Sequence, residues 1–205
     1  MNRHVMPRVP LLLAATLILA ACSAEPDGPQ LIEPDGPPPL EGAALGGDFT
    51  LTGEDGTRVS FSDFDGKYRT IYFGYAFCPD VCPTDNQRAM AGLKQFEKEF
   101  PELGAKIQPL FVSVDPGRDT SKVLGEFTDA FHPRLIGLTG EPEELARIAA
   151  QFGVFFSVPD EKGDGYLVDH SNITFLFGPD GKPLATLPTD QGPAAVRDEL
   201  AKWVR

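Results

Sequence analysis

Two cysteines between a strand and a helix constrain this chain more than any other feature. Cys78 and Cys82 are separated by three residues, and Pro83 follows directly. Residues 69–75, just before them, form an apolar run of the kind found in buried central strands. After them, apolar side chains recur at helical spacing, at Ala89, Leu93, Phe96 and Phe100. We therefore expect two thiols at the turn from a central strand into a helix.

The first residues read as an export signal. Arg3 and Arg8 precede an apolar run that ends at residue 21, which is too short to span a bilayer as a helix. The sequence Leu-Ala-Ala-Cys at residues 19–22 resembles a bacterial lipobox, in which the cysteine is acylated before cleavage. We expect a lipoprotein signal peptide over residues 1–21 and lipidation of Cys22. The alternative is an ordinary secretory signal with an incidental cysteine.

Residues 22–45 are rich in proline and glycine and show no hydrophobic periodicity. We interpret them as a tether that holds a domain over residues 46–205 away from the membrane. The expected location is the periplasmic side of a bacterial membrane, with the lipid as anchor. In that compartment thiols can oxidise.

Strand and helix patterns alternate along residues 46–205. One hairpin is expected around the Asp-Gly pair at 55–56 and another around 179–181. Buried strands at 107–114 and 135–138 are each followed by a helical pattern, and a last helix covers 193–204. This order predicts an α/β fold with a central mixed sheet flanked by helices. Thiols after a central strand make the expected layout thioredoxin-like, with an added N-terminal β-hairpin.

The formal net charge of −12 makes a nucleic-acid partner unexpected. An acidic surface suits cations or a basic protein face, or it serves only solubility.

The thiol pair fits either a metal ion or a redox pair. Pro83 suits the first position of a helix, which would make Cys82 its N-cap and lower the pKa of its thiol. Thioredoxin-type redox motifs have two residues between the cysteines, whereas this chain has three. The wider spacing favours a metal, although it also permits a disulfide between Cys78 and Cys82.

A third ligand would have to be a histidine. After the predicted signal the chain has His132, which we interpret as a surface residue, and His170, which precedes a strand. In thioredoxin-like folds the loop that corresponds to His170 approaches the cysteine turn. Two thiolates and one imidazole favour copper(I), since zinc usually takes a fourth ligand. Met90 is the only methionine after the signal, which excludes a Met-rich copper site.

Taken together, the motifs resemble those of the Sco/SenC proteins, which are copper chaperones of cytochrome c oxidase assembly. The resemblance covers nearly all of the expected domain. Ala76 departs from the pattern, because a threonine or a similar small polar residue is expected there. The matching motifs lie at residues 72–75, 78–83, 114–120, 131–133, 137–140 and 168–171.

The resemblance implies that Cys78, Cys82 and His170 bind one copper ion, as Cu(I) or Cu(II). It implies a membrane-anchored domain outside the cytoplasm that helps to build the Cu-A centre of oxidase subunit II. Other periplasmic copper or thiol-redox proteins are further expected partners. It also suggests a role near the site for Asp115. From the residues alone, Asp115 could simply end a strand, and Asp80 is best interpreted as a solvated turn acid.

Three functions stay open at this point. The first is a metallochaperone, which is not an enzyme. The second is a thiol-disulfide oxidoreductase that uses Cys78 and Cys82 to reduce the Cu-A cysteines. The third is a copper or redox sensor. His170 favours the first function, because disulfide exchange needs no distant imidazole.

Overall fold

The computed structural model describes Met1 and residues 28–160, 163 and 165–205. The predicted signal peptide and Cys22 therefore lie outside the described residues. Within the described residues, no helix is both long enough and apolar enough to cross a membrane.

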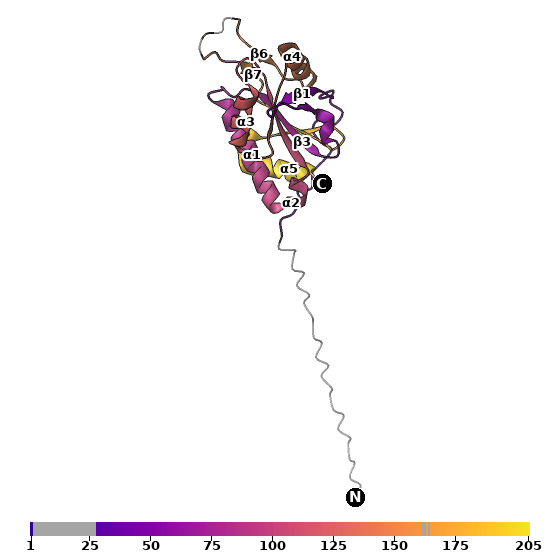
Figure 1. Ribbon diagram of the computed structural model, residues 1–205. Helices are drawn as coiled ribbons and strands as arrows, with labels where there is room; N and C mark the ends of the chain where they lie inside the picture. Colours follow the sequence, from indigo (N-terminus) through magenta and orange to yellow (C-terminus); the bar gives the residue numbers. More distant parts are fainter. Residues whose placement is uncertain (2–27, 161–162, 164) are drawn as a thin grey trace.

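One mixed seven-stranded sheet forms the centre of the domain, with the strand order β2-β1-β5-β4-β3-β8-β9 (Figure 1). Strands β3, β4 and β5 run parallel. Strand β8 pairs antiparallel with β3 and β1 with β5, and the outer strands β9 and β2 pair antiparallel with β8 and β1. The strands are β1 (Thr50–Gly53), β2 (Arg58–Ser60), β3 (Tyr68–Gly74), β4 (Ile107–Ser113), β5 (Ile136–Thr139), β8 (Thr174–Phe177) and β9 (Pro183–Leu187). A separate ribbon pairs β6 (Phe156–Ser157) with β7 (Asp169–His170).

The parallel strands are central because they are apolar on both faces, and every residue of β3 and β4 is buried. Parallel strands end at the same edge of a sheet, and ligands of open α/β sheets bind outside that edge. Here the loops that follow β3 and β4 meet at this edge, where Val114 N–H donates to the Gly74 carbonyl at 2.8 Å. The cysteine loop is therefore placed at the edge where such folds carry their sites.

The helices connect the strands and cover the sheet. They are α1 (Val81–Glu99), α2 (Pro101–Gly104), α3 (Ser121–Asp129), α4 (Pro142–Gln151) and α5 (Pro193–Trp203), with short 3-10 turns at η1 (Phe61–Phe64) and η2 (Thr189–Gln191). Helices α1 and α5 lie side by side (Figure 1). They approach closely at Gly92, where an added Cβ would lie 2.6 Å from the side chain of Val196.

Aromatic side chains fill the two faces of the sheet differently. On one face Tyr72 stacks on Phe111, which in turn contacts Phe127 of α3. On the other face Phe73 contacts Phe152, the residue that ends α4. Phe152 also packs against three further buried rings, those of Phe49, Phe61 and Phe177. The core thus holds β3 rigidly from both sides, and with it the loop that carries Cys78.

The second half of the predicted tether lies against the domain. Ile32 N–H donates to the Ala201 carbonyl at 3.1 Å, and Leu40 N–H donates to the Leu184 carbonyl at 3.0 Å. Within the described residues, this stretch therefore covers part of the domain rather than extending away from it. The boundary at residue 45 stays a prediction.

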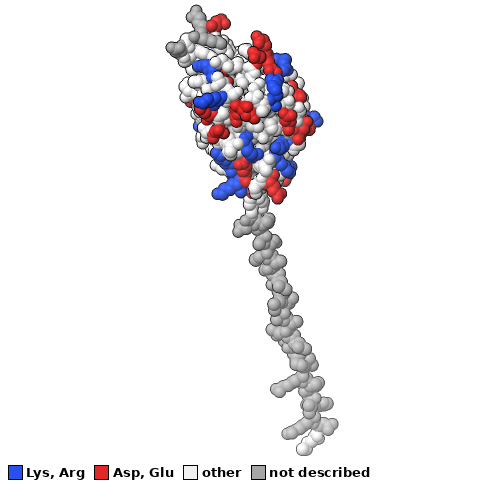
Figure 2. Space-filling view, viewed as in Figure 1, with Lys and Arg blue, Asp and Glu red and all other residues white. Residues whose placement is uncertain are grey.

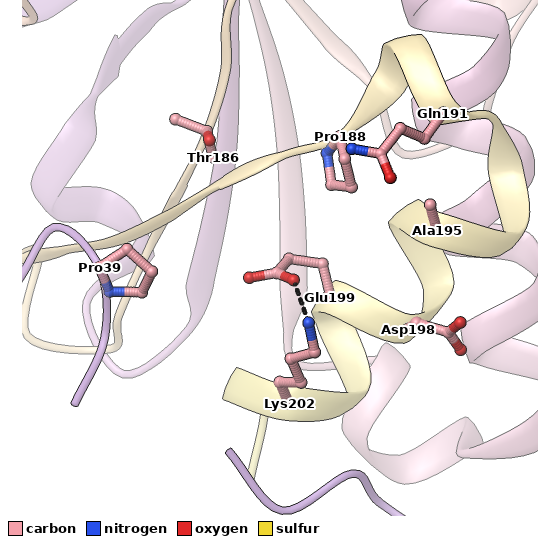
Figure 3. A pocket seen from close by; sticks show the side chains of 8 residues that line it. All are labelled: Pro39, Thr186, Pro188, Gln191, Ala195, Asp198, Glu199 and Lys202. Carbon is pink, nitrogen blue, oxygen red and sulfur yellow. Dashed lines mark hydrogen bonds and ion pairs between the residues drawn. The ribbon is translucent and has the colours of Figure 1, made fainter. Parts of the chain in front are cut away.

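A hollow of about 360 Å³ opens between Pro39, β9 and α5 (Figure 3). Lys202 and Glu199 face each other there at 2.8 Å and neutralise one another. Neither cysteine nor histidine lines this hollow, so it offers no soft metal ligand. On the face shown in Figure 2, acidic and basic side chains are interspersed.

Candidate metal centre

Three soft or borderline ligands converge at the carboxyl end of β3. The sulfurs of Cys78 and Cys82 and a ring nitrogen of His170 all lie within 4.8 Å of one another. Cys78 lies on the loop after β3, Cys82 in the first turn of α1, and His170 in β7, so three separate segments supply them. The structure thus brings together the three residues that the sequence predicted as a set. Both cysteines are free thiols.

The imidazole of His170 is held in one tautomer. Its Nδ1 lies 3.0 Å from the carbonyl oxygen of Ser171, which can only accept, so Nδ1 carries the proton. The other nitrogen, Nε2, then keeps its lone pair and lies 3.0 Å from Sγ of Cys82. A backbone carbonyl that orients the far nitrogen is the usual support of a metal-binding histidine.

Helix α1 begins earlier than the sequence predicted. Asp80 is its N-cap and Val81 its first residue, so Cys82 lies inside the first turn and is not the N-cap. The early start turns Cys82 N–H toward Cys78, and it donates to that sulfur at 3.4 Å. A free amide at the start of the helix thus donates its hydrogen bond to Cys78, the more exposed of the two cysteines.

The expected lowering of the Cys82 pKa is wrong. Cys82 is fully buried, and this burial raises the pKa of its thiol far above the ordinary value. The metal-free Cys82 is therefore a neutral thiol beside the Nε2 lone pair. Since a metal binds the thiolate, loading must release this proton.

Gly74 makes room for the inner thiol. A Cβ at this position would lie 2.9 Å from Sγ of Cys82 and 2.7 Å from the Tyr72 ring. The last residue of β3 therefore has to be small if Cys82 is to lie against the strand. The Tyr72 ring also meets the imidazole of His170 edge to face, with 6.1 Å between ring centres.

The loop before His170 is tied to the cysteine loop through Tyr75. Val168 N–H donates to the Tyr75 hydroxyl at 3.2 Å, and the Tyr75 ring packs edge to face on His170. The β6–β7 ribbon adds the backbone pairing of His170 with Phe156. Sequence reasoning placed His170 before a strand but missed this ribbon, because two-residue strands leave no periodic signal.

The site opens to solvent on the side of Cys78. A hollow of about 220 Å³ lies there, lined by Tyr75, Cys78, Pro79, Asp80, Val81, Leu167, Val168, Asp169 and His170. Val81 and Leu167, which line it, are exposed apolar side chains, and so is Phe77, which directly precedes Cys78. Asp80 is exposed as expected and adds an acid to the rim.

His132 lies away from this cluster and is not the surface residue that the sequence suggested. Its side chain is 3% exposed, with Nε2 at 3.2 Å from a Glu97 carboxylate oxygen and Nδ1 accepting from Arg134 N–H at 3.1 Å. Burial lowers the pKa of its imidazole. The Phe-His-Pro context gave no sign of this burial, which depends on side chains from α1.

The loop after β4 contacts the cysteine loop. Asp119 accepts from Ala76 N–H at 3.1 Å and from the Ser113 hydroxyl at 2.7 Å. Burial raises the pKa of the Asp119 carboxyl to about 6. Asp115 is also buried and pairs with Arg118. The loop of Asp115, for which the resemblance suggested a role near the site, is thus adjacent to the cysteine loop. Its carboxylates are not part of the three-residue cluster.

The donor set fits a soft monovalent or borderline divalent ion. Two sulfurs and one imidazole suit copper(I) or copper(II). Metal–ligand bonds of roughly 2.0–2.3 Å place any two ligands at most about 4.6 Å apart, close to the 4.8 Å limit of this cluster. Small side-chain rotations therefore suffice to enclose one ion.

Several known proteins are similar to this chain in sequence. The sequence model of the SCO1/SenC family matches residues 37–205. The chain is 39% identical over 158 residues to Protein SenC of Rhodobacter capsulatus, covering 77% of this chain and 70% of that protein. It is 40% identical over 138 residues to Protein SCO1 homolog 1, mitochondrial, of Arabidopsis thaliana, covering 67% of this chain and 40% of that protein. The match spans about half the length of several such relatives.

Solved structures agree with the fold. The crystal structure of Arabidopsis thaliana ScoI with copper bound matches with a TM-score of 0.71 and 35% identity, covering 77% of this chain and 96% of that chain. The thioredoxin-like α/β fold expected from the sequence is thereby confirmed. Because the family match includes both loop cysteines and His170, and covers most of the sequence, this chain belongs to the SCO1/SenC family.

Proposed function

We propose that this protein is a membrane-anchored copper chaperone that delivers copper to the Cu-A centre of cytochrome c oxidase subunit II. The observation that carries the proposal is the convergence of Cys78, Cys82 and His170 within 4.8 Å. Copper-bound relatives of the same fold support the choice of metal. One ion per domain is expected, because the described residues hold one such cluster.

The layout of the site suits transfer rather than storage. Cys82 is fully buried, whereas Cys78 and His170 border the hollow that opens to solvent. A partner's thiolate can therefore enter beside the outer ligands while Cys82 still holds the metal. The exposed apolar side chains of Phe77, Val81 and Leu167 near the thiols offer a surface on which the partner can exclude water.

Copper titration of the reduced protein tests the ligand set. Wild type should bind one Cu(I) in competition with a chelator, and its Cu(II) form should show a sulfur-to-copper charge-transfer band. Cys78→Ser, Cys82→Ser and His170→Ala should each weaken binding strongly.

His132→Gln serves as the matched control, because His132 lies outside the cluster. It should leave copper affinity unchanged in folded protein. Unchanged affinity in His170→Ala would remove His170 from the ligand set.

The anchor is proposed from the sequence alone. Cys22 would carry the lipid, and the domain would lie on the periplasmic side of the membrane. One acyl chain binds membranes only marginally, so stable anchoring needs the two or three chains of a bacterial lipoprotein. Wild type and Cys78→Ser should take up labelled palmitate, and Cys22→Ser should not. Lack of label in wild type would contradict the lipobox interpretation.

A thiol-disulfide oxidoreductase is the second candidate. Its support is the unequal burial of the free thiols, with Cys82 at 0% and Cys78 at 8% exposure. An outer thiol that attacks and an inner thiol that resolves are what disulfide exchange requires. The substrate would then be the oxidised Cu-A cysteine pair.

A further inference from the structure

Arg118 lies where the two loops that carry the metal-site ligands meet. Its guanidinium carbon lies 3.6 Å from the ring centre of Tyr166, on the loop that leads to His170. The same carbon lies 5.3 Å from the ring centre of Phe77, which directly precedes Cys78, and 5.5 Å from that of Tyr75. All three distances are within the range of cation–π attraction. Arg118 thus bridges the cysteine loop and the His170 loop through aromatic faces.

Asp115 fixes two members of this arrangement at once. One carboxylate oxygen accepts from Nε of Arg118, and the other accepts from the Tyr166 hydroxyl, each at 2.5 Å. Asp115 is 1% exposed, so the carboxylate that accepts both bonds is shielded from water. We call Asp115, Arg118 and Tyr166 the Arg118 clamp.

The backbone alone holds the His170 loop weakly. Strands β6 and β7 have two residues each, and a ladder this short is marginal in water. Three further bonds are those of Ser171 N–H to the Phe155 carbonyl at 2.9 Å, of Phe155 N–H to the Ser171 hydroxyl at 3.1 Å and of Val168 N–H to the Tyr75 hydroxyl at 3.2 Å. Side-chain contacts must therefore supply much of what keeps His170 beside the thiols.

We propose that Arg118 is a positioning residue for the metal centre. By stacking between Tyr166 and the rings of the cysteine loop, it holds the His170 loop in place. It thereby sets how readily His170 is released when a partner's ligand enters. The proposal rests on the proposed function for its copper readout, whereas the coupling of the loops is a property of the metal-free protein.

The competing explanation is that Arg118 only neutralises the buried carboxylate of Asp115. Arg118→Lys separates the two explanations. Lysine keeps a positive charge for Asp115, but it lacks the planar guanidinium that stacks on aromatic rings. Arg197→Lys is the matched control, because Arg197 lies on α5 and pairs with Glu99 and Asp198, which are both on helices.

Amide hydrogen exchange of the metal-free, reduced protein is the primary test. Arg118→Lys should speed exchange at Val168 and Ser171 by about 10-fold, while the amides of β3 and β4 keep their protection. Cu(I) affinity of the same variant should fall by about 10-fold, which corresponds to about 1.4 kcal/mol. Arg197→Lys should change neither quantity. Unchanged exchange at Val168 and Ser171 in Arg118→Lys would overturn the proposal.

If Arg118→Lys also loses protection in β3, its fold is disturbed and a second pair of variants tests the proposal instead. Tyr166→Phe keeps the ring under the guanidinium, and Tyr166→Leu removes it. Tyr166→Leu should speed exchange at Val168 and Ser171 more than Tyr166→Phe does, and equal exchange in the two would overturn the proposal. If wild type fails to bind copper, the proposed function is rejected. The hydrogen-exchange result still tests the role of the Arg118 clamp, because it is measured on the metal-free protein.

Discussion

Nε2 of His170 lies 3.0 Å from Sγ of Cys82, and this contact occupies the space in which a shared metal ion would lie. Nδ1 is committed to the Ser171 carbonyl, so Nε2 presents its lone pair to the neutral thiol of Cys82. A proton and a metal therefore compete for the same two atoms. The metal-free site is kept in shape by this contact, and loading replaces the proton.

Gly74→Ala should damage both the fold and the site. The new Cβ would lie 2.9 Å from Sγ of Cys82 and 2.7 Å from the Tyr72 ring, so α1 or Tyr72 must move. Overpacking of this kind costs about 1–3 kcal/mol. Urea unfolding should show that loss, and Cu(I) competition should show weaker binding.

Gly125→Ala in α3 is the matched control for this change. A Cβ there has its nearest neighbour, Glu54, at 3.9 Å, which is ordinary contact. Alanine also favours a helix over glycine by roughly 1 kcal/mol. This variant should be as stable as wild type or more stable. Equal stability of Gly74→Ala and wild type would contradict the steric argument.

Much of the fold was predictable because burial on both sheet faces leaves a strong apolar signal. The pattern at residues 69–75 corresponds to β3, and that at residues 107–114 corresponds to β4. The hydroxyl of Thr120 accepts from Val123 N–H at the start of α3, as a threonine just before a helical pattern predicts. Helix capping and hydrophobic periodicity depend on residues that are close together in the chain, so they can be predicted from the sequence.

The rest of the site depends on contacts between distant residues. The true start of α1 at Val81 was missed because proline is acceptable throughout the first turn of a helix, and Pro83 is the third residue of α1. The raised pKa of Cys82 follows from burial against β3, which spacing alone does not reveal. The contact of Arg118 with Tyr166 leaves no local signal, because the two residues are far apart in sequence.

Asp119→Asn should change how stability depends on pH. The pKa of Asp119 is about 6 in the folded protein, chiefly because of burial, against 3.8 ordinarily. Between these values the folded state keeps a proton that the unfolded state releases, so stability falls as pH rises through this window. The loss is complete above about pH 6 and amounts to roughly 2–3 kcal/mol.

The comparison is made by urea unfolding at pH 4 and pH 7. Asparagine does not ionise, so the stability of Asp119→Asn relative to wild type should improve by that amount between the two values. Asp129→Asn is the control, because Asp129 is an exposed acid at the end of α3. A difference between Asp119→Asn and wild type that stays constant with pH would contradict the burial argument.

Oxidation should block copper loading. A disulfide between Cys78 and Cys82 removes two of the three proposed ligands at once. Protein oxidised with a mild disulfide-forming reagent should take up little Cu(I) in the chelator competition, and reduction should restore one equivalent. Equal uptake before and after reduction would show that the thiols are not the ligands.

The last prediction separates the chaperone from the reductase at His170. Transfer of copper through shared ligands depends on His170, because it helps to hold the ion once one sulfur has been surrendered. Disulfide exchange needs only Cys78 and Cys82. In a deletion strain at limiting copper, His170→Ala should therefore fail to restore oxidase assembly, while its dithiol still reduces a test disulfide. Cys78→Ser should fail in both assays, and His132→Gln should rescue fully. Full rescue by His170→Ala, with none by Cys78→Ser, would reject the chaperone and leave the reductase.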